Sequence, residues 1–291
     1  MTSREDVSIA RPLRFAGRRR QPVTTLATYV VLLCGALITL GPFLLSFVTA
    51  LKSPEQFAST SPLSLPAPAT GANFAELFAA GGFISPIAVT AQVVAAVLVG
   101  QLLFSIMAAF AFARLEFRGR DVLFWGYLAT MMVPQVVTVI PLYVMFTELG
   151  LRNTFWSLVL PFVFGSPYAV FLLREYFRGI PEDLVSAARI DGAGPWRILW
   201  LIIVPLSRPI IATLAVITVV THWNNFMWPL IITTGTDWQV ITVATAALQG
   251  QHNANWTLVM AATTIAMAPL LVLFTIFQRT IVNSISLTGF K

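Results

Sequence analysis

Six apolar segments of about twenty residues or more recur along this 291-residue chain, and they limit its fold more than any other feature. An α-helix needs about 20 residues to cross the ~30 Å hydrocarbon core of a bilayer. Lipid also excludes irregular backbone, because nothing there can satisfy open hydrogen bonds. Since 57% of the residues are hydrophobic and 10% are charged, a water-soluble domain of this composition could not cover its surface with polar side chains. The sequence therefore predicts an all-α polytopic membrane protein.

The six predicted transmembrane helices cover residues 23–50, 84–113, 122–146, 154–173, 210–228 and 257–277. Residues 51–83 are rich in Ser, Pro, Gly and Ala, so we expect them outside the bilayer. Pro42 is expected to kink the first span. Residues 229–256 mix apolar runs with polar interruptions such as TTGTDWQ, which favours an outer re-entrant or amphipathic segment. A seventh span in this region would move the C-terminus to the other side of the membrane.

Basic residues are divided unevenly between the two predicted sides of the membrane. With the N-terminus inside, sixteen of the eighteen Lys and Arg residues lie on the inner side, and only Lys52 and Arg152 lie outside. The positive-inside rule then places both termini in the cytoplasm. We expect a basic tail over residues 1–22, a transmembrane domain over 23–280 and a C-terminal tail over 281–291. Topology accounts for the net charge of +6, so nucleic acid is not an expected partner.

The sequence lacks the motifs of a catalytic or energy-converting site. His222 and His252 are far apart and near no Cys or carboxylate cluster, so we expect no metal site. No phosphate-binding GxxxxGK[ST] loop or hydrolase serine motif occurs, and we expect neither catalytic residues nor a cofactor bound by this chain. The spans have no acidic residue at their centres, which proton or sodium coupling usually uses. Any energy must then come from a partner.

The longest polar interruption in the apolar second half, residues 177–209, carries the signals of two short helices. Pro181 and Pro195 each stand where a first helical residue is expected. Glu182 and Asp183 would favour the positive end of the first helix. These signals predict a structured loop, which is either a docking element or simply a well-capped connection.

The small residues of this loop support close contact and a sharp turn. Ala187 and Ala188 present little side chain, so another surface could approach the backbone closely. Asp191 and Gly192 are expected to end the first helix, because glycine adopts the left-handed C-terminal conformation without steric cost.

The run SAARIDGAGPWRILWLIIVPLSRP resembles the cytoplasmic EAA loop of permease subunits in binding-protein-dependent ABC importers. That pattern is EAA, a Gly three residues on, and then Ile-x-Leu-Pro. The residues that match it are Ala187, Ala188, Asp191, Gly192, Ala193 and Pro205. Ser186 stands where the family has Glu, so a carboxylate contact to the ATPase is not carried over to it. Glu182 or Asp183, one turn earlier, are candidate substitutes.

Two further stretches resemble the carbohydrate-importing subfamily, on the side of the six-span maltose-transporter permease. They are VPQVVTVIPLYVMFTELGLRNTFWSLVLPFVFGSPYAVFLLREYF at residues 133–177 and WNNFMWPL at residues 223–230. The resemblance implies a bacterial inner-membrane subunit that shares its pathway with a second permease subunit. It also implies two copies of a cytoplasmic ATPase, which hold ATP and Mg and each bind one EAA loop through its coupling helix. An extracytoplasmic binding protein would deliver a sugar or oligosaccharide.

Glycerol 3-phosphate or glycerophosphodiesters are an alternative substrate class within this family. Outside it, a secondary transporter would be favoured by two similar halves or a carboxylate within a span, and neither is evident. A membrane assembly subunit would lack a coupling loop.

The C-terminal end also resembles the tail of carbohydrate permeases that reaches the ATPase dimer interface, and the alternative is a frayed terminus. The residues concerned are Leu287, Thr288, Gly289 and Lys291.

Candidate substrate contacts are the aromatic and amide side chains near the end of the fifth span. They are Trp223, Asn224, Asn225 and Trp228. The tryptophans could equally form an interfacial belt facing lipid headgroups. The two amides are harder to explain in this way, since unpaired amides are costly in lipid.

Overall fold

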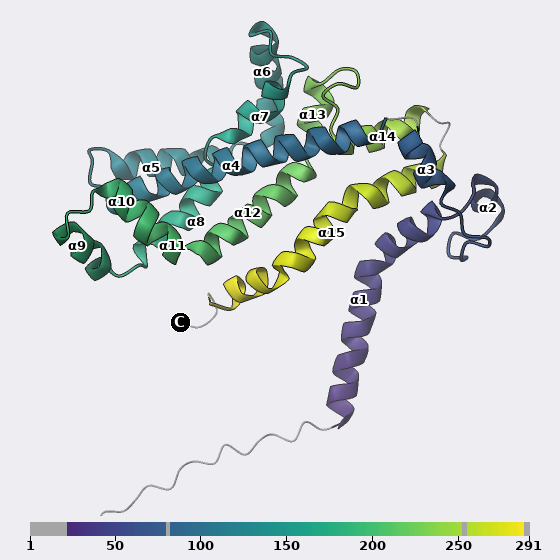
Figure 1. The fold of residues 1–291 in the computed structure, drawn as a ribbon, viewed down its shortest axis with the longest axis horizontal. Coiled ribbons are helices and arrows are strands. Elements are labelled where there is room, and N and C mark those ends of the chain that lie inside the picture. The colour runs from purple at the N-terminus through teal and green to yellow at the C-terminus, as the bar shows by residue number, and fades with distance from the viewer. Residues whose placement is uncertain (1–21, 80–81, 252–254, 288–291) are drawn as a thin grey trace, which may run out of the picture. The chain divides into compact units, whose positions relative to one another are not determined.

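The computed structural model describes residues 22–79, 82–251 and 255–287, and every regular element in these ranges is a helix. The chain divides after Leu45, and the residues from Ser46 onward form the body that carries the candidate sites. Figure 1 labels the helices. In chain order they are α1 (Pro22–Ala50), α2 (Pro54–Ser59), α3 (Ala72–Ala79), α4 (Ile84–Arg114), α5 (Arg120–Ala129), the 3₁₀ turn η1 (Thr130–Met132), α6 (Gln135–Glu148), α7 (Phe155–Val163), α8 (Pro167–Arg178), α9 (Glu182–Ile190), α10 (Pro195–Ile198), the π turn η2 (Leu199–Ile203), α11 (Val204–Leu206), α12 (Arg208–Trp223), α13 (Met227–Ile232), α14 (Ile241–Gln251) and α15 (Trp256–Leu287).

The all-α membrane class is confirmed. Within the described residues, five helical segments are long and apolar enough to cross a bilayer, and a sixth is added if one bent pair counts as a single span. The five segments are Thr25–Ala50, Ile84–Arg114, Phe155–Arg178, Arg208–Ile232 and Trp256–Gln278. Each overlaps one of the six segments expected from the sequence, and the bent pair overlaps the remaining one.

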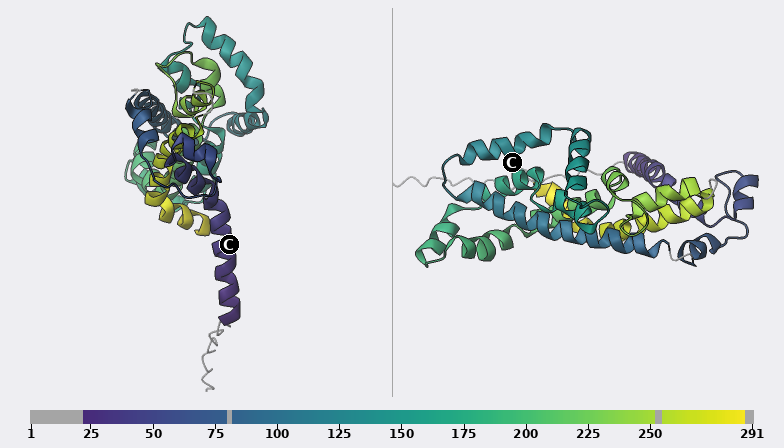
Figure 2. Two further views of the ribbon diagram at one scale, coloured as in Figure 1. Left: turned by 90° about the vertical axis from the view of Figure 1, so that its right-hand side faces the viewer. Right: turned by 90° about the horizontal axis from the view of Figure 1, so that it is seen from above.

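That remaining segment, residues 122–146, was expected as one span, and the expectation of a continuous helix is wrong. Arg120–Met132 and Gln135–Glu148 meet at an angle of 98°, a corner that is visible in Figure 2. Pro134 is the cause, because a proline disfavours helical backbone at the residue before it. Val133 accordingly takes extended angles, with φ −79° and ψ 115°.

Two other predicted spans are also interrupted. α7 ends at Val163 and α8 begins at Pro167, while α12 ends at Trp223 and α13 begins at Met227. Side chains from neighbouring helices satisfy the backbone at the first interruption. Gln101 Nε2 donates to the Phe162 carbonyl oxygen at 3.2 Å, and Ser105 Oγ accepts from the Ser166 amide at 3.0 Å. The α7–α8 break is therefore a supported feature of the fold, as polar backbone inside a membrane requires.

α4 is the central helix of the body, and it packs against α7, α8, α12 and α14. Its approach to α7 is close enough to require glycine. A Cβ atom at Gly100 would collide with the Val163 side chain and lie 2.8 Å from the Val163 carbonyl oxygen. The adjacent residue Gln101, which also binds the Phe162 carbonyl oxygen of α7, accepts from Thr218 Oγ1 at 3.0 Å and joins α12 to α4 through a buried hydrogen bond.

Residues 229–256 contain the end of α13 and the 11-residue helix α14. At 1.5 Å per residue, α14 is about 16 Å long and too short to span a bilayer. It packs between α4 and α15, and the Ile241 amide donates to Thr90 Oγ1 of α4 at 2.8 Å.

Candidate functional site

The loop predicted to couple the chain to an ATPase folds as a short helix held between two corners. α9 begins at Glu182, one residue after the expected start, because Pro181 occupies the preceding N-cap position. At the other end Gly192 has a φ of +80°, and the Ala193 amide donates to the Ala188 carbonyl oxygen at 2.9 Å. Pro195 is the first residue of α10, as expected. The left-handed glycine corner predicted from the sequence is confirmed.

One side of α9 is anchored in the apolar core. Val185 is fully buried in a cluster that includes Phe177 of α8 and Ile198 of α10. Near the end of the loop, Tyr176 Oη donates to the Leu206 carbonyl oxygen at 3.3 Å and ties α8 to α11. The loop is therefore fixed to the helices on both sides of it.

The other side of α9 presents apolar side chains that are exposed in the described structure. Leu184 is 46% exposed and Ile190 87% exposed, while Ala187 lies between them in sequence and is also exposed. These residues, at i, i+3 and i+6, share one face of a helix; we call it the α9 apolar face. Trp196, 60% exposed, adds a large apolar side chain just after the glycine corner.

The sequence reasoning missed Leu184, Ile190 and Trp196, because it followed the EAA pattern. Leu184, Ala187 and Ile190 follow one another at a spacing of three residues, which was a usable signal: α9 buries Val185 and does not need these further apolar residues for its own core.

Arg114, the last residue of α4, is the joint between that helix and the loop. Its side chain is 8% exposed and forms an ion pair with Glu182 in the first turn of α9. Its guanidinium also donates to the carbonyl oxygens of Phe177 and Ile180, just where α8 ends. Carbonyls at a helix end lack partners within the helix, so this one side chain satisfies α8 and holds α9.

The two carboxylates considered as substitutes for the missing Glu therefore differ in role. Glu182 forms an ion pair with Arg114, and its Oε1 also lies 3.4 Å from Arg189 Nη1. Asp183 is exposed and forms no ion pair within the described part of the chain. Ser186 is half-buried on α9. Asp183 is thus the carboxylate that remains open to a partner.

A second arginine joins α8 to α4 and α5. The Arg174 guanidinium carbon lies 4.0 Å from the centroid of the Phe124 ring, a cation–π contact. The same side chain forms two ion pairs: Arg174 Nη1 lies 2.6 Å from Glu175 Oε1, and Arg174 Nη2 lies 3.9 Å from Asp121 Oδ1. Arginines that satisfy the positive-inside pattern thus also hold this end of the bundle together.

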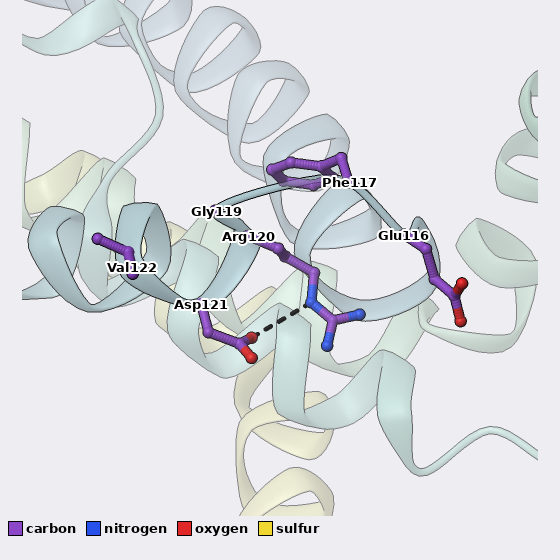
Figure 3. A pocket seen from close by; sticks show the side chains of 6 residues that line it. All are labelled: Glu116, Phe117, Gly119, Arg120, Asp121 and Val122. Carbon is purple, nitrogen blue, oxygen red and sulfur yellow. Dashed lines mark hydrogen bonds and ion pairs between the residues drawn. The ribbon is translucent and has the colours of Figure 1, made fainter.

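The turn between α4 and α5 borders the loop at residues 177–209. Its side chains line a hollow of about 350 Å³. Arg120 Nε lies 3.2 Å from Asp121 Oδ1, the contact drawn as a dashed line in Figure 3. A larger crevice of about 560 Å³ adjoins it and is lined by Arg114, Glu182 and Arg189. Acidic and basic side chains line both hollows. This arrangement is more typical of ion pairs that connect neighbouring helices than of a ligand-binding site.

The four candidate substrate residues are not brought together as one cluster. Trp223 is buried, and its Nε1 donates to the Ala266 carbonyl oxygen at 2.9 Å. Trp228 is also buried, and its Nε1 donates to the Ser157 carbonyl oxygen at 2.8 Å. An interfacial belt is therefore wrong for both indoles, because their polar edges point at backbone carbonyls within the protein.

Trp223 and Asn224 line a common hollow of about 370 Å³ between the end of α12, α14 and α15, which we call the α12–α14–α15 hollow. Trp228 packs against Phe146 instead, with ring centroids 5.8 Å apart. The Asn225 carbonyl oxygen accepts from Thr242 Oγ1 at 2.7 Å, so this residue ties α14 to the α12–α13 turn.

The predicted C-terminal tail begins inside a helix. α15 continues to Leu287, beyond the expected end of the last span. Thr288, Gly289 and Lys291 lie outside the described residues.

A family model matches residues 101–287, a stretch that includes α9, the glycine corner and the α12–α14–α15 hollow. The model describes the inner membrane component of binding-protein-dependent transport systems. The chain belongs to this family. Membership excludes a secondary transporter and a membrane assembly subunit, the two readings from outside the family.

Several curated permeases are similar over most of their length. The diacetylchitobiose uptake system permease protein of Streptomyces coelicolor is 30% identical over 91% of this chain and 88% of its own. The sn-glycerol-3-phosphate transport system permease protein of Brucella abortus is 31% identical over 91% of this chain and 97% of its own length. The arabinooligosaccharides transport system permease protein of Halalkalibacterium halodurans is 33% identical over 67% of this chain and 70% of its own length.

The permease fold is also shared with a solved structure. One chain of a bacterial ABC transporter involved in the import of the acidic polysaccharide alginate superposes with a TM-score of 0.80 at 22% identity. The match covers 90% of this chain and 97% of that one. This chain and that one therefore share the same fold.

Proposed function

We propose that this permease forms half of the translocation pathway of an ATP-driven importer for a neutral sugar or oligosaccharide. A second permease subunit completes the pathway, and an extracytoplasmic binding protein delivers the substrate. Two copies of a cytoplasmic ATPase hold ATP and Mg, and one of them docks on the loop at residues 177–209. Both termini lie in the cytoplasm, and the chain itself binds no cofactor and catalyses no reaction.

The observation that carries this proposal is the two-sided construction of α9. Its apolar face, with Leu184 and Ile190, is open to a partner, while Val185 and the Arg114–Glu182 pair fix the opposite side to the transmembrane helices. A partner that moves on the apolar face therefore moves the ends of α4 and α8. Alternating access then becomes a two-state equilibrium that the ATPase biases through its contacts.

The basic side chains on the predicted outer side favour a neutral substrate over glycerol 3-phosphate. Lys52 is buried and its Nζ donates to the Ser61 carbonyl oxygen at 3.1 Å and to Ser64 Oγ at 3.0 Å. The Arg152 guanidinium lies over the Tyr143 ring, 5.6 Å from its centroid. Both cations have partners in the chain, whereas phosphate recognition normally uses available cationic groups.

The test is reconstitution of the permease with its partner permease, ATPase and binding protein in proteoliposomes. We expect the binding protein to stimulate ATP hydrolysis and the vesicles to accumulate arabinotriose or N,N′-diacetylchitobiose. Accumulation of sn-glycerol 3-phosphate instead would reject the neutral substrate. Stimulation that persists when the permease is left out would reject its role in coupling.

Docking on the α9 apolar face is tested by binding of the ATPase to the permease pair in detergent. Leu184→Asp and Ile190→Asp place a charge in the proposed interface and should abolish co-purification. The matched control is Leu63→Asp, which changes an exposed leucine in the segment predicted to lie outside the membrane. Equal co-purification by all three variants would show that the ATPase docks elsewhere.

A further inference from the structure

The α12–α14–α15 hollow has a mixed wall that neither lipid nor a protein core requires. Two aromatic side chains, Trp223 and Phe226, and two amides, Asn224 and Gln249, line it. No charged side chain is among its described lining residues. Its volume of about 370 Å³ falls within the range of small-molecule sites.

The hollow lies at a depth where exposed amides need a polar partner. α12 begins at Arg208, which belongs to the basic residues on the predicted inner side of the membrane. Asn224 follows 16 residues later, which corresponds to about 24 Å along a helix from that side. This is within the ~30 Å thickness of the hydrocarbon core. Asn224 and Gln249 are nevertheless exposed. Since an unpaired amide in hydrocarbon costs several kcal/mol, the hollow must face water, a ligand or another protein.

Its hydrogen-bonding groups are partly free. Asn224 Nδ2 donates to the Val220 carbonyl oxygen at 2.8 Å, which leaves its Oδ1 and one N–H without a partner among the described residues. The Gln249 amide likewise has no hydrogen bond within that part of the chain. The hydroxyls of Thr245 and Thr263 each donate to a carbonyl oxygen of their own helix at 2.8 Å, so their oxygen lone pairs remain open. The wall therefore offers both donors and acceptors beside aromatic rings.

We propose that the α12–α14–α15 hollow binds one ring of the transported neutral sugar. This inference rests on the proposed function and adds the place on this chain where the substrate is held. A sugar ring presents hydroxyls that both donate and accept, which the amides and threonine oxygens match. Its C–H faces pack against aromatic side chains. An anionic substrate would find no cation in the described wall, and an acyl chain would leave the amides unpaired.

Cysteine labelling tests whether the hollow is open to water and occupied by sugar. In a Cys34→Ser background, which removes the single native thiol, Asn224→Cys is introduced and the complex is reconstituted. During ATP turnover with binding protein, a water-soluble maleimide should label this thiol, and arabinotriose or N,N′-diacetylchitobiose should slow labelling at least fivefold. Gln92→Cys, at an exposed position on α4 outside the hollow, should show no such protection.

Each other outcome overturns the proposal. Labelling without protection would show a water-filled hollow that does not hold the sugar. A thiol that stays unlabelled in the assembled complex but reacts in the isolated permease would show that the partner subunit covers the hollow. A thiol that reacts in neither would show that lipid or detergent fills it.

Transport supplies an independent measurement. Gln249→Ala removes an amide from the wall, and the loss of one hydrogen bond to the sugar should lower uptake at saturating binding protein about tenfold, equivalent to 1.4 kcal/mol. Gln92→Ala should transport as the wild type does. If the wild-type complex transports either sugar and Gln249→Ala does so equally well, the hollow is not the sugar site although the proposed function stands. If the wild type transports neither sugar, the proposed function itself fails.

Discussion

Arg114 and Glu182 stand 68 residues apart in the chain and form an ion pair between the end of α4 and the first turn of α9. The same guanidinium caps the carbonyls at the end of α8. The ends of α4 and α8 and the first turn of α9 therefore meet at one side chain.

Arg114→Ala should uncouple ATP hydrolysis from transport. The Phe177 and Ile180 carbonyl oxygens would lose their donor and Glu182 its main counter-ion, at a cost of about 1–3 kcal/mol for buried acceptors left unsatisfied. The measurement is sugar accumulated per ATP hydrolysed in proteoliposomes, which should fall severalfold. Arg120→Ala, which breaks a more exposed pair with Asp121, serves as control. If Arg114→Ala accumulated as much sugar per ATP hydrolysed as the wild type, the proposed role of Arg114 in connecting α4 and α8 to α9 would be wrong.

Gly192→Asp should impair coupling while Gly194→Asp does not. No atom lies within 4 Å of a Cβ built at either glycine, so neither substitution collides with a neighbour. They differ in backbone: φ is +80° at Gly192 and −74° at Gly194. A non-glycine residue in the left-handed region costs about 1–2 kcal/mol, which would disturb the corner after α9. If transport-coupled ATP hydrolysis were the same in both variants, the proposal that α9 passes the movement of the ATPase to α4 and α8 would be wrong.

Gly100→Ala should destabilise the permease. The added methyl would collide with Val163 where α4 crosses the end of α7, and overpacking of this kind costs about 1–3 kcal/mol. Thermal unfolding in detergent should show a lower midpoint. Gly126→Ala is the control, because its new Cβ meets nothing within 4 Å. Equal midpoints for both variants would mean that the two helices separate at little cost.

Removal of residues 287–291 should reduce coupling and leave assembly intact. This expectation comes from the resemblance of Leu287, Thr288, Gly289 and Lys291 to a tail that reaches the ATPase dimer interface. Co-purification of the full complex reports assembly, and stimulated ATP hydrolysis reports coupling. A truncated chain with full stimulation would favour a terminus without a function.

Length and apolar composition were enough to place the membrane-spanning helices, because a bilayer demands about 20 apolar residues whatever the packing. The 98° corner at Pro134 was harder to foresee. A proline within an apolar run predicts a disturbance, but the direction of the next helix depends on neighbours distant in sequence. The α7–α8 break has the same origin, since its supporting groups, Gln101 and Ser105, lie on α4.

In the loop at residues 177–209, local chemistry was predictable and long-range contact was not. Gly192 and Pro195 act within a few residues of themselves, so their roles follow from sequence. Arg114 was counted only as an inner positive charge, because nothing near it in sequence indicates a partner 68 residues away. The indole N–H groups of Trp223 and Trp228 likewise bond to backbone carbonyls, whose positions only the fold determines.

Because Lys52 is buried, the orientation of the permease in the membrane can be measured by chemical modification of amines. The sequence has two lysines, and the second, Lys291, lies with the N-terminal amine in the tails predicted to be cytoplasmic. The Lys52 side chain is 1% exposed, so it is closed to a membrane-impermeant acylating reagent. Sealed right-side-out vesicles should therefore leave the chain unmodified, and inside-out vesicles should acylate it. The direction of insertion can thus be read from amine reactivity alone, without an engineered tag.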